Sequence, residues 1–170
     1  MNQNRMLDAV LGGWQASTVF VLESGRTFTP VVGTSNNSGA AAGNWYPNLV
    51  GDPHLENPSV GQWFNPAAFA IPTPGTFGNS GHNILRGPGI EDIDFSLGKK
   101  FAIPLFGRES GNLQLRFDAL NVINHANFDI PNANIGTANA GRITATTGNY
   151  NSTNNAFGPR RLQLGARFSF

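Results

Sequence analysis

The sequence predicts an all-β fold of antiparallel, up-and-down strands, and three observations support this prediction. Four segments alternate apolar and polar residues with the period of two that is typical of a strand with one apolar face. The chain of 170 residues contains 21 Gly, 11 Pro and 13 Phe, and a composition so rich in turn-forming and aromatic residues is common in all-β proteins. One short and two long segments connect the strands, so the two ends of the sheet differ.

The first two strands are predicted near residues 12–22 and 91–103. The apolar face of the first strand consists of Trp14, Ala16, Thr18, Phe20 and Leu22. Val19 and Val21 lie on its opposite face and weaken the alternation. The apolar face of the second strand consists of Ile93, Phe95, Leu97, Phe101 and Ile103. Lys99 interrupts that face with a positive charge.

The third strand is predicted near residues 112–124, where the alternation begins clearly and then changes phase. Its apolar face starts with Leu113, Leu115, Phe117 and Ala119. Leu120 and Val122 then fall on the polar face, and a β-bulge would account for this slip.

The fourth strand, near residues 160–170, has the strictest alternation and ends on a phenylalanine. Its apolar face consists of Leu162, Leu164, Ala166, Phe168 and Phe170. In a transmembrane barrel such a face meets lipid, and the last strand must pair to close the wall. A terminal aromatic residue on such a strand is also the signal that the outer-membrane barrel-assembly machinery reads. We therefore interpret these five residues as a barrel-assembly signal, with outer-membrane lipid and the assembly machinery as partners.

The connections favour a transmembrane β-barrel. Residues 104–111 (PLFGRESG) form a compact turn, whereas residues 23–88 and 125–157 are long loops rich in Gly, Pro, Asn and Ser. If the C-terminus lies in the periplasm, strand direction places both long loops outside the cell, which is the asymmetry of outer-membrane barrels. Four strands cannot close a barrel, since the smallest bacterial examples have about eight. We therefore expect residues 1–170 to be the C-terminal part of a transmembrane β-barrel within a longer parent chain.

Composition excludes several classes of function. Charged residues make up 12% of the chain and the formal net charge is +1, so a strongly charged partner surface is not expected, and no motif indicates nucleic-acid binding. With 0 Cys, neither disulfides nor cysteine-based metal sites can form. There is no apolar run long enough for a transmembrane helix and no secretory signal at the start, so we expect the signal to lie upstream in the parent.

No residue pattern predicts catalysis, a cofactor or a metal site. Ser80 and His82 lie in the loop sequence GNSGHN, which lacks the nucleophile elbow of a hydrolase. His54, His82 and His125 are far apart in the sequence, and independent loop positions are favoured over a shared metal. The chain is therefore not expected to be an enzyme.

Charged residues leave two alternatives open. Asp92 and Asp94, beside Glu91, share one strand face and would pair with Arg116 or Lys100 across strands rather than bind a cation. A second group consists of Arg142, Arg160 and Arg161. These arginines would either attract an anionic ligand or lipopolysaccharide phosphates, or form a solvated strand entrance.

Aromatic residues in the first long loop are the candidates for ligand contact. Trp45, Tyr46, Trp63 and Phe64 lie among Pro, Asn and Gly, where rings can stack on a sugar or an aromatic chelate. The alternative, which we favour for Trp63 and Phe64, is that the rings form a small apolar cluster that folds the loop back on itself.

Six segments together resemble a known family. They are GGWQASTVFVLESGRTF, QWFNPAAF, GTFGNSGHNILRGPG, DIDFSLGKKF, LQLRFDALNVINHANF and GPRRLQLGARFSF. In this order they resemble the C-terminal end of TonB-dependent outer-membrane transporters, most closely the Oar-like branch with a carboxypeptidase-regulatory-like module. The resemblance covers the chain from about residue 11 to residue 170. It implies a barrel of roughly 22 strands with a plug inside. It also implies uptake of a scarce ligand, driven by the inner-membrane energy-coupling complex.

The sequence also allows a function of a different class. A soluble β-sandwich carbohydrate-binding module would use Trp45, Tyr46 and Trp63 as a stacking platform. Its outer strand faces should then be charged, and the low charge content argues against this. We therefore expect an outer-membrane transporter segment, with the soluble binding module as the alternative.

Overall fold

The computed structural model describes residues 10–33, 45–104, 110–147 and 157–170. These residues form antiparallel sheets of four, two and two strands, which confirms the predicted all-β, antiparallel fold class. No helix in the described segments has the length and hydropathy needed to cross a membrane. The chain divides into two compact units. The sheet unit comprises Met1–Leu22, Glu91–Ala126 and Phe157–Phe170, and the loop unit comprises Glu23–Ile90 and Asn127–Ala156.

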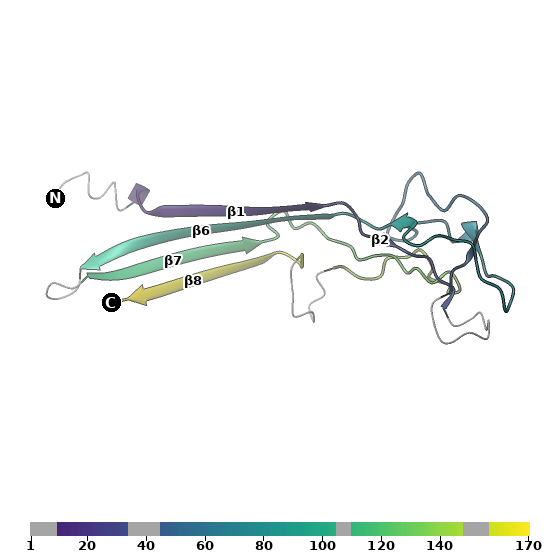
Figure 1. The fold of residues 1–170 in the computed structure, drawn as a ribbon. Coiled ribbons are helices and arrows are strands. Elements are labelled where there is room, and N and C mark those ends of the chain that lie inside the picture. The colour runs from purple at the N-terminus through teal and green to yellow at the C-terminus, as the bar shows by residue number, and fades with distance from the viewer. Residues whose placement is uncertain (1–9, 34–44, 105–109, 148–156) are drawn as a thin grey trace. The chain divides into compact units, whose positions relative to one another are not determined.

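The sheet unit is built on four long strands in the order β1-β6-β7-β8. They are β1 (Trp14–Glu23), β6 (Ile90–Pro104), β7 (Ser110–Leu120) and β8 (Arg161–Ser169). Neighbouring strands run in opposite directions (Figure 1). Each strand therefore pairs with the next long strand along the chain, which is up-and-down topology.

Strand register brings the apolar residues of the sheet unit onto one face. Leu97 of β6 lies opposite Phe117 of β7, which in turn lies opposite Leu164 of β8. The row nearer the end of β7 joins Phe95, Ala119 and Leu162, and the row nearer its start joins Phe101, Leu113 and Phe168. Because side chains alternate between faces, the polar rows between them lie on the other side. The period-two alternation in the sequence is thus the pattern of a single two-faced sheet.

The bulge predicted in the third strand is wrong, because β7 ends at Leu120. Asn121 follows with a left-handed φ of 48° and is buried. Its amide Nδ2 donates to the carbonyls of His125 and Gly158, each at 2.8 Å, and its Oδ1 accepts from the His125 N–H at 2.9 Å. Its own N–H donates to Asp94 Oδ1 at 2.9 Å. The phase slip in the sequence therefore marks a strand end, which this asparagine ties to β6 and to the segment before β8.

The two long connections fold into one compact unit instead of forming separate loops. Within the loop unit, β2 (Thr27–Phe28) pairs with β5 (Leu85–Arg86), and β3 (Asn48–Leu49) pairs with β4 (Phe69–Ala70). The short 3-10 helix η2 (Pro66–Ala68) precedes β4. The sequence predicted the lengths of these connections but not their shared fold.

The loop unit has a hydrophobic core of its own. Its buried members are Phe28, Phe64, Ala68, Phe69 and Leu85. The ring of Phe64 lies 5.8 Å from that of Phe28 and 6.0 Å from that of Phe69, the latter edge-on. Both connections contribute, since Ala133 and Ile135 of the second pack against this core. Backbone hydrogen bonds also join them, from Ile143 N–H to the Val60 carbonyl and from Trp63 N–H to the Gly141 carbonyl.

Candidate functional site

The apolar face of the sheet unit is exposed and is the first candidate functional surface. Leu164 of β8 is 87% exposed, and Phe20 and Leu22 of β1 are also exposed. A soluble protein rarely leaves a contiguous apolar patch of this kind uncovered. The inner strands β6 and β7 each have a neighbour on both sides, so the paired stretches of their backbone need no water. The face is therefore suited to an apolar phase or a large apolar partner.

The five residues predicted as the assembly signal lie on or beside β8. Four of them pair with apolar residues of β7: Leu162 with Ala119, Leu164 with Phe117, Ala166 with Leu115 and Phe168 with Leu113. Phe170 follows the strand and is 93% exposed, with its ring 6.0 Å from that of Phe168. The strand thus presents a continuous apolar row that ends in two neighbouring rings. Recognition of this row by the assembly machinery stays a prediction.

Lys99, which interrupts the apolar face in the sequence, is held between aromatic rings. Its Nζ lies 4.6 Å from the centroid of the Trp14 ring and 5.0 Å from that of Phe101, and it donates to the Val10 carbonyl at 2.5 Å. The residue is 5% exposed. Cation–π contacts strengthen when the cation is shielded from water. The charge is therefore accommodated within the apolar face by Trp14, an aromatic residue of the kind found at membrane interfaces.

The polar face of the sheet unit holds a small network, which differs from the predicted one. Arg116 donates to Asp118 Oδ1 at 2.8 Å, and Ser96 donates to the same oxygen at 2.5 Å. Asp94 instead accepts from the Asn121 backbone, and Asp92 Oδ1 is buried without a hydrogen-bond partner. The expected pairing of Asp92 or Asp94 with Arg116 is therefore wrong, because residues 116 and 118 share one strand face and pair with each other.

A cleft in the loop unit is the second candidate site. It has a volume of about 390 Å³, and its wall includes Thr27, His54, Trp63, Asn83 and Arg86. These side chains combine an aromatic ring, a guanidinium, an imidazole, an amide and a hydroxyl. Small-molecule sites are commonly concave and combine apolar walls with a few polar groups that fix the ligand, and their volumes start near 300 Å³. The cleft is therefore large enough for a small ligand.

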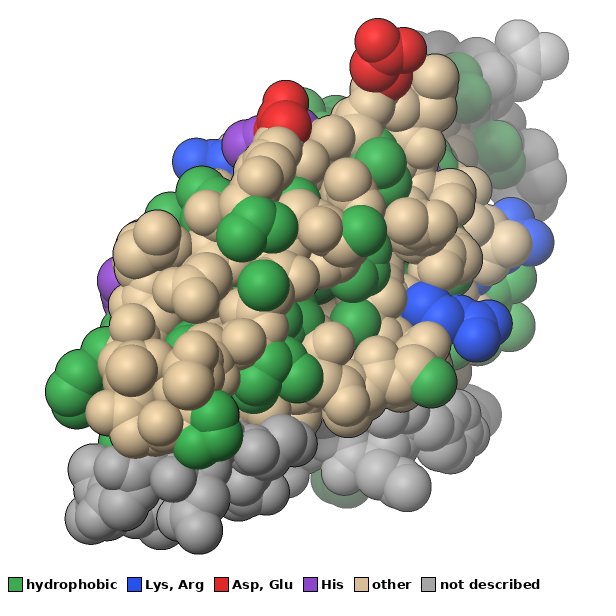
Figure 2. Space-filling model, turned by 90° about the vertical axis from the view of Figure 1, so that its right-hand side faces the viewer, with side chains coloured by type: hydrophobic (Ala, Val, Ile, Leu, Met, Phe, Trp, Pro, Cys, Tyr) green, Lys and Arg blue, Asp and Glu red, His purple; other side chains and the backbone are tan. Residues whose placement is uncertain are grey.

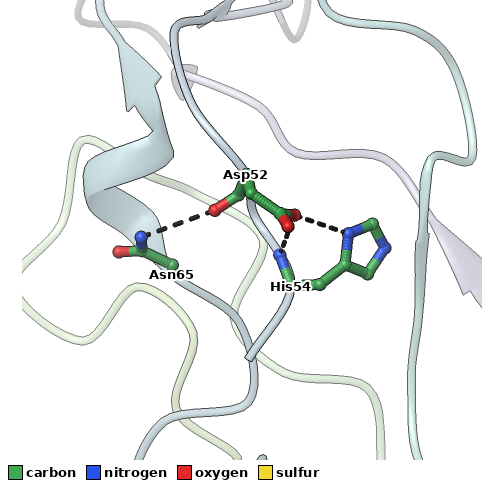
Figure 3. A network of polar contacts seen from close by, with 3 residues as sticks. All are labelled: Asp52, His54 and Asn65. Carbon is green, nitrogen blue, oxygen red and sulfur yellow. Dashed lines mark hydrogen bonds and ion pairs between the residues drawn. The ribbon is translucent and has the colours of Figure 1, made fainter. Parts of the chain in front are cut away.

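One wall of the cleft is positioned by a tight turn at Asp52 (Figure 3). Asp52 Oδ1 accepts from both the backbone N–H and the Nδ1 of His54, each at 2.9 Å. The Asp52 carbonyl accepts from the Asn65 side chain at 3.5 Å, and Asn65 in turn caps η2 by accepting from the Ala67 N–H. The hydrogen bonds from His54, first from its backbone and then from its ring, hold the pKa of Asp52 below the usual value. The carboxylate therefore accepts from the backbone and the ring of His54 and orients the imidazole.

Trp63 and Arg86 are linked directly in the cleft. The indole N–H of Trp63 donates to the Arg86 carbonyl at 2.8 Å. The Arg86 Nη1 donates to Ser24 Oγ at 3.0 Å and to the Gly25 carbonyl at 2.9 Å. Gly25 must be glycine, because a Cβ there would lie 1.7 Å from the Gly87 carbonyl oxygen. This close approach of two backbones places Arg86 within hydrogen-bond distance of Ser24 and Gly25.

The aromatic residues predicted as ligand contacts are separated by the structure. Trp63 is half-buried and lines the cleft, whereas Phe64 touches the cleft from the core, where it is only 2% exposed. The apolar cluster predicted for Phe64 is therefore confirmed, and contact of Phe64 with a ligand stays a prediction. Trp45 and Tyr46 do not line the cleft, and Trp45 packs against Phe77 with 5.7 Å between ring centroids.

The remaining candidates from the sequence do not form a site. No hydrogen bond among the described residues joins Ser80 to His82. Within the described ranges, no group of three His, Asp or Glu side chains is placed to hold a metal. Arg142 and Arg160 are exposed, and Arg161 is half-buried at the start of β8. The predicted role of these three arginines in attracting an anion stays untested.

Arg86 and Asn83 line the cleft, but no motif in the sequence marks them as site residues. Asn83 has a left-handed φ of 55°, and its N–H donates to the Thr29 hydroxyl at 2.9 Å. Both residues lie in the segment GTFGNSGHNILRGPG, whose many glycines indicate close backbone approaches. That glycine content was the available signal, but it could not reveal which side chains would meet Trp63.

The face of the molecule shown in Figure 2 carries few charges. In the face shown in Figure 2, hydrophobic and uncharged polar side chains cover most of the area, and charged side chains lie in small groups near its outline. Such a surface is not built to attract a highly charged polymer by its overall field. A charged side chain inside the cleft therefore affects a ligand by direct contact and not through the overall field of the protein.

Comparison with known proteins gives one match. A family model described as "Outer membrane beta barrel domain" matches residues 1–163. No curated protein and no solved structure matches the chain. The family match agrees with the antiparallel sheet and its exposed apolar face.

Proposed function

We propose, since the chain belongs to the family of outer membrane beta barrel domains, that it forms the C-terminal wall of a TonB-dependent transporter that takes up a scarce ligand. Family membership assigns the chain to the outer membrane as part of a barrel. The step to energy-coupled transport is our own proposal. It is supported by the six sequence segments that resemble TonB-dependent transporters and by the folded, cleft-bearing loop unit.

The observation that carries the proposal is the contrast between the two faces of one sheet. Every row of paired positions that we traced from β6 through β7 to β8 is apolar on one face, apart from Lys99. The other face carries Ser96, Arg116 and Asp118, joined by hydrogen bonds. In a barrel, the first face meets lipid and the second faces a polar interior. A transporter wall requires this division, because its interior must admit water and ligand.

The partners we propose follow from the open edges of the sheet. β1 and β8 are the outer strands, so each has one edge without a paired strand in the four-stranded sheet. Unpaired edges are not stable in lipid, because their N–H and C=O groups lack water. We propose that strands of the remaining barrel pair there, around a plug that contacts the inner-membrane energy-coupling complex. The barrel-assembly machinery would recognise β8 and Phe170.

The alternative, a soluble carbohydrate-binding β-sandwich, is less well supported. A sandwich buries the apolar face of each sheet against the other. Leu164, Phe20 and Leu22 are instead largely exposed. The aromatic cleft of the loop unit is compatible with carbohydrate binding, but such a cleft can serve a transporter equally well.

Two measurements test the proposal in the native host. The first is an immunoblot of cell fractions, in which we expect a band in the outer membrane that is much heavier than 18.1 kDa. A soluble band of 18.1 kDa would contradict the barrel function. The second is uptake of labelled ferric chelates, cobalamin, oligosaccharides and peptides by wild-type and gene-deleted cells. We expect one uptake to require both the gene and the proton gradient. If the gene-deleted cells still take up all of these ligands, the transport proposal is wrong, whereas the outer-membrane location is not affected.

A further inference from the structure

The cleft of the loop unit has the chemistry of a small-molecule site that no comparison assigns. It lies wholly within residues of the loop unit, so its geometry does not depend on the position of the sheet unit. Its aromatic wall is Trp63, which is held at two points, by its indole N–H to the Arg86 carbonyl and by its backbone N–H to the Gly141 carbonyl. A ring fixed in this way loses little conformational entropy when a ligand binds. The C–H face of a sugar ring is a suitable partner for the negative face of an indole.

Arg86 adds a positive charge that has no acidic partner within the part of the chain that the structure describes. Its Nη1 donates to two neutral oxygens, Ser24 Oγ and the Gly25 carbonyl. No described Asp or Glu forms an ion pair with it. A guanidinium has five N–H donors and binds carboxylates in a two-pronged manner, so donors remain after these two bonds. No Asp or Glu is among the described residues that line the cleft, so Arg86 can bind an anionic group of a ligand there.

The neutral polar groups of the cleft favour hydroxyl-bearing ligands. The ionised Asp52 can only accept hydrogen bonds, so in the neutral imidazole the proton of His54 lies on Nδ1 and Nε2 is an acceptor. Figure 3 shows the edge that carries Nε2 directed away from Asp52. Asn83 is fixed by two contacts with the Thr29 hydroxyl, at 2.9 and 3.3 Å. An acceptor, an amide and the Thr27 hydroxyl suit a ligand with several hydroxyl groups.

We propose that this cleft binds an acidic sugar, with the pyranose ring on Trp63 and the carboxylate on Arg86. The volume of about 390 Å³ accommodates one or two sugar rings and is too small to enclose a large metal macrocycle. This inference rests on the proposed transport function, for which it names the ligand class. The proposed site binds the sugar and carries out no covalent step.

The test measures binding to the full-length protein extracted from outer membranes in detergent. The probe is digalacturonic acid, and neutral galactobiose is the matched control ligand. We expect the acidic probe to bind at least about tenfold more tightly, since a charged hydrogen bond contributes more than a neutral one. We also expect its affinity, but not that of galactobiose, to fall as salt is added. Equal affinities, or no binding of the acidic probe, would overturn the proposal.

Variants locate the binding to the cleft. Arg86→Gln should weaken the acidic probe about ten- to a hundredfold and leave galactobiose unchanged. Arg142→Gln is the control, because Arg142 is an exposed arginine of the same unit outside the cleft. Trp63→Ala should weaken both sugars, with Trp45→Ala as its control. Because Arg86 also bonds Ser24 and Gly25, Arg86→Lys provides a second variant that keeps the charge, and near-UV circular dichroism checks folding. Unchanged affinity in a folded Arg86→Gln protein would contradict the site.

Uptake measurements separate failure of the site from failure of transport. If the acidic probe binds through Arg86 but enters cells equally well with and without a proton gradient, the site is correct and energy-coupled transport is wrong. If energy-coupled uptake of the probe occurs but Arg86→Gln leaves it unchanged, transport is correct and the site is wrong. We expect uptake to require both the gradient and Arg86.

Discussion

Phe20 in the sheet unit and Phe64 in the loop unit have opposite surroundings. Phe20 of β1 is 68% exposed, and its neighbours on the apolar face, such as Leu22, are exposed as well. Phe64 is 2% exposed and packs against two other phenylalanine rings. The loop unit thus buries Phe64 with Phe28 and Phe69 in a core of its own, as a protein in water does. The sheet unit leaves Phe20 and Leu22 for a different medium. Apolar side chains are therefore buried in a core in the loop unit and exposed on one face of the sheet in the sheet unit.

The largest effect is expected from a charge placed on the apolar, lipid-facing side of the sheet unit. Phe168→Asp places a carboxylate in the row that pairs β8 with Leu113 of β7. We expect the amount of full-length protein assembled in the outer membrane to fall by at least about tenfold, because an ionised group on the lipid face is strongly disfavoured. Immunoblots of outer-membrane fractions measure this. Deleting Phe170 should have a similar effect.

The control for this variant is Ser169→Asp, which adds the same charge one residue later. Ser169 pairs with Asn112, so it lies on the opposite, polar face of β8. Assembly of Ser169→Asp should remain close to that of the wild type. Equal loss in both variants would mean that the C-terminal strand does not distinguish its two faces.

The second prediction concerns the hydrophobic core of the loop unit. Phe64→Ala should destabilise the loop unit by about 3–5 kcal/mol, because it leaves a cavity between Phe28 and Phe69. Assembly in the membrane should continue, since the sheet unit does not use this core. Limited proteolysis of the extracted protein should cut the loop unit faster while β6, β7 and β8 resist. Phe77→Ala, at a position that is 77% exposed, is the matched control and should change little. Loss of membrane assembly in Phe64→Ala would show that the two units fold together.

The contrast also explains what could be predicted from the sequence. The sheet was predictable because a strand with two different faces repeats every two residues, and Leu113, Leu115 and Phe117 show that repeat locally. The family match confirms the outer-membrane barrel, whereas the TonB-dependent activity stays a prediction. The assembly role of Phe170 is likewise still a prediction.

The loop unit was not predictable, because its contacts join residues that are distant in sequence. Val31 forms a bridge with Asn134, and Ile143 donates to the Val60 carbonyl. No local periodicity in the sequence predicts such long-range pairs. The cleft depends on the same long-range order, since Arg86 reaches its place only where Gly25 and Gly87 approach closely. Trp63 could therefore be suspected from its residue type, but its partner could not.

The third prediction concerns the end of β7, where the sheet gives way to the segment before β8. Asn121→Ala should lower the free energy of unfolding by about 1–3 kcal/mol, because it leaves the His125 and Gly158 carbonyls and the His125 N–H without the partners that the side chain provides. Urea unfolding in detergent measures the change. Asn124→Ala is the control, because Asn124 also has a left-handed φ, of 55°, but is exposed. The difference in unfolding free energy between the two variants separates the contribution of the hydrogen bonds from that of the backbone conformation. If the two variants are equally stable, the side-chain hydrogen bonds of Asn121 do not stabilise the end of β7.

The smallest expected effect concerns pH and the turn that positions His54 in the cleft. The pKa of Asp52 is lowered by its hydrogen bonds from His54, so folding favours the ionised form. The contribution of this turn is therefore complete above the ordinary carboxyl pKa of about 4 and is lost as the pH falls through the lower folded pKa. After correction for the intrinsic pH dependence of exchange, protection of the His54 amide should be constant above that range and decrease below it. The Ala67 amide is the internal control, because it donates to the uncharged Asn65 side chain. If both amides lose protection together, the loop unit is opening as a whole, and the Asp52 carboxylate is not what holds the imidazole in the cleft.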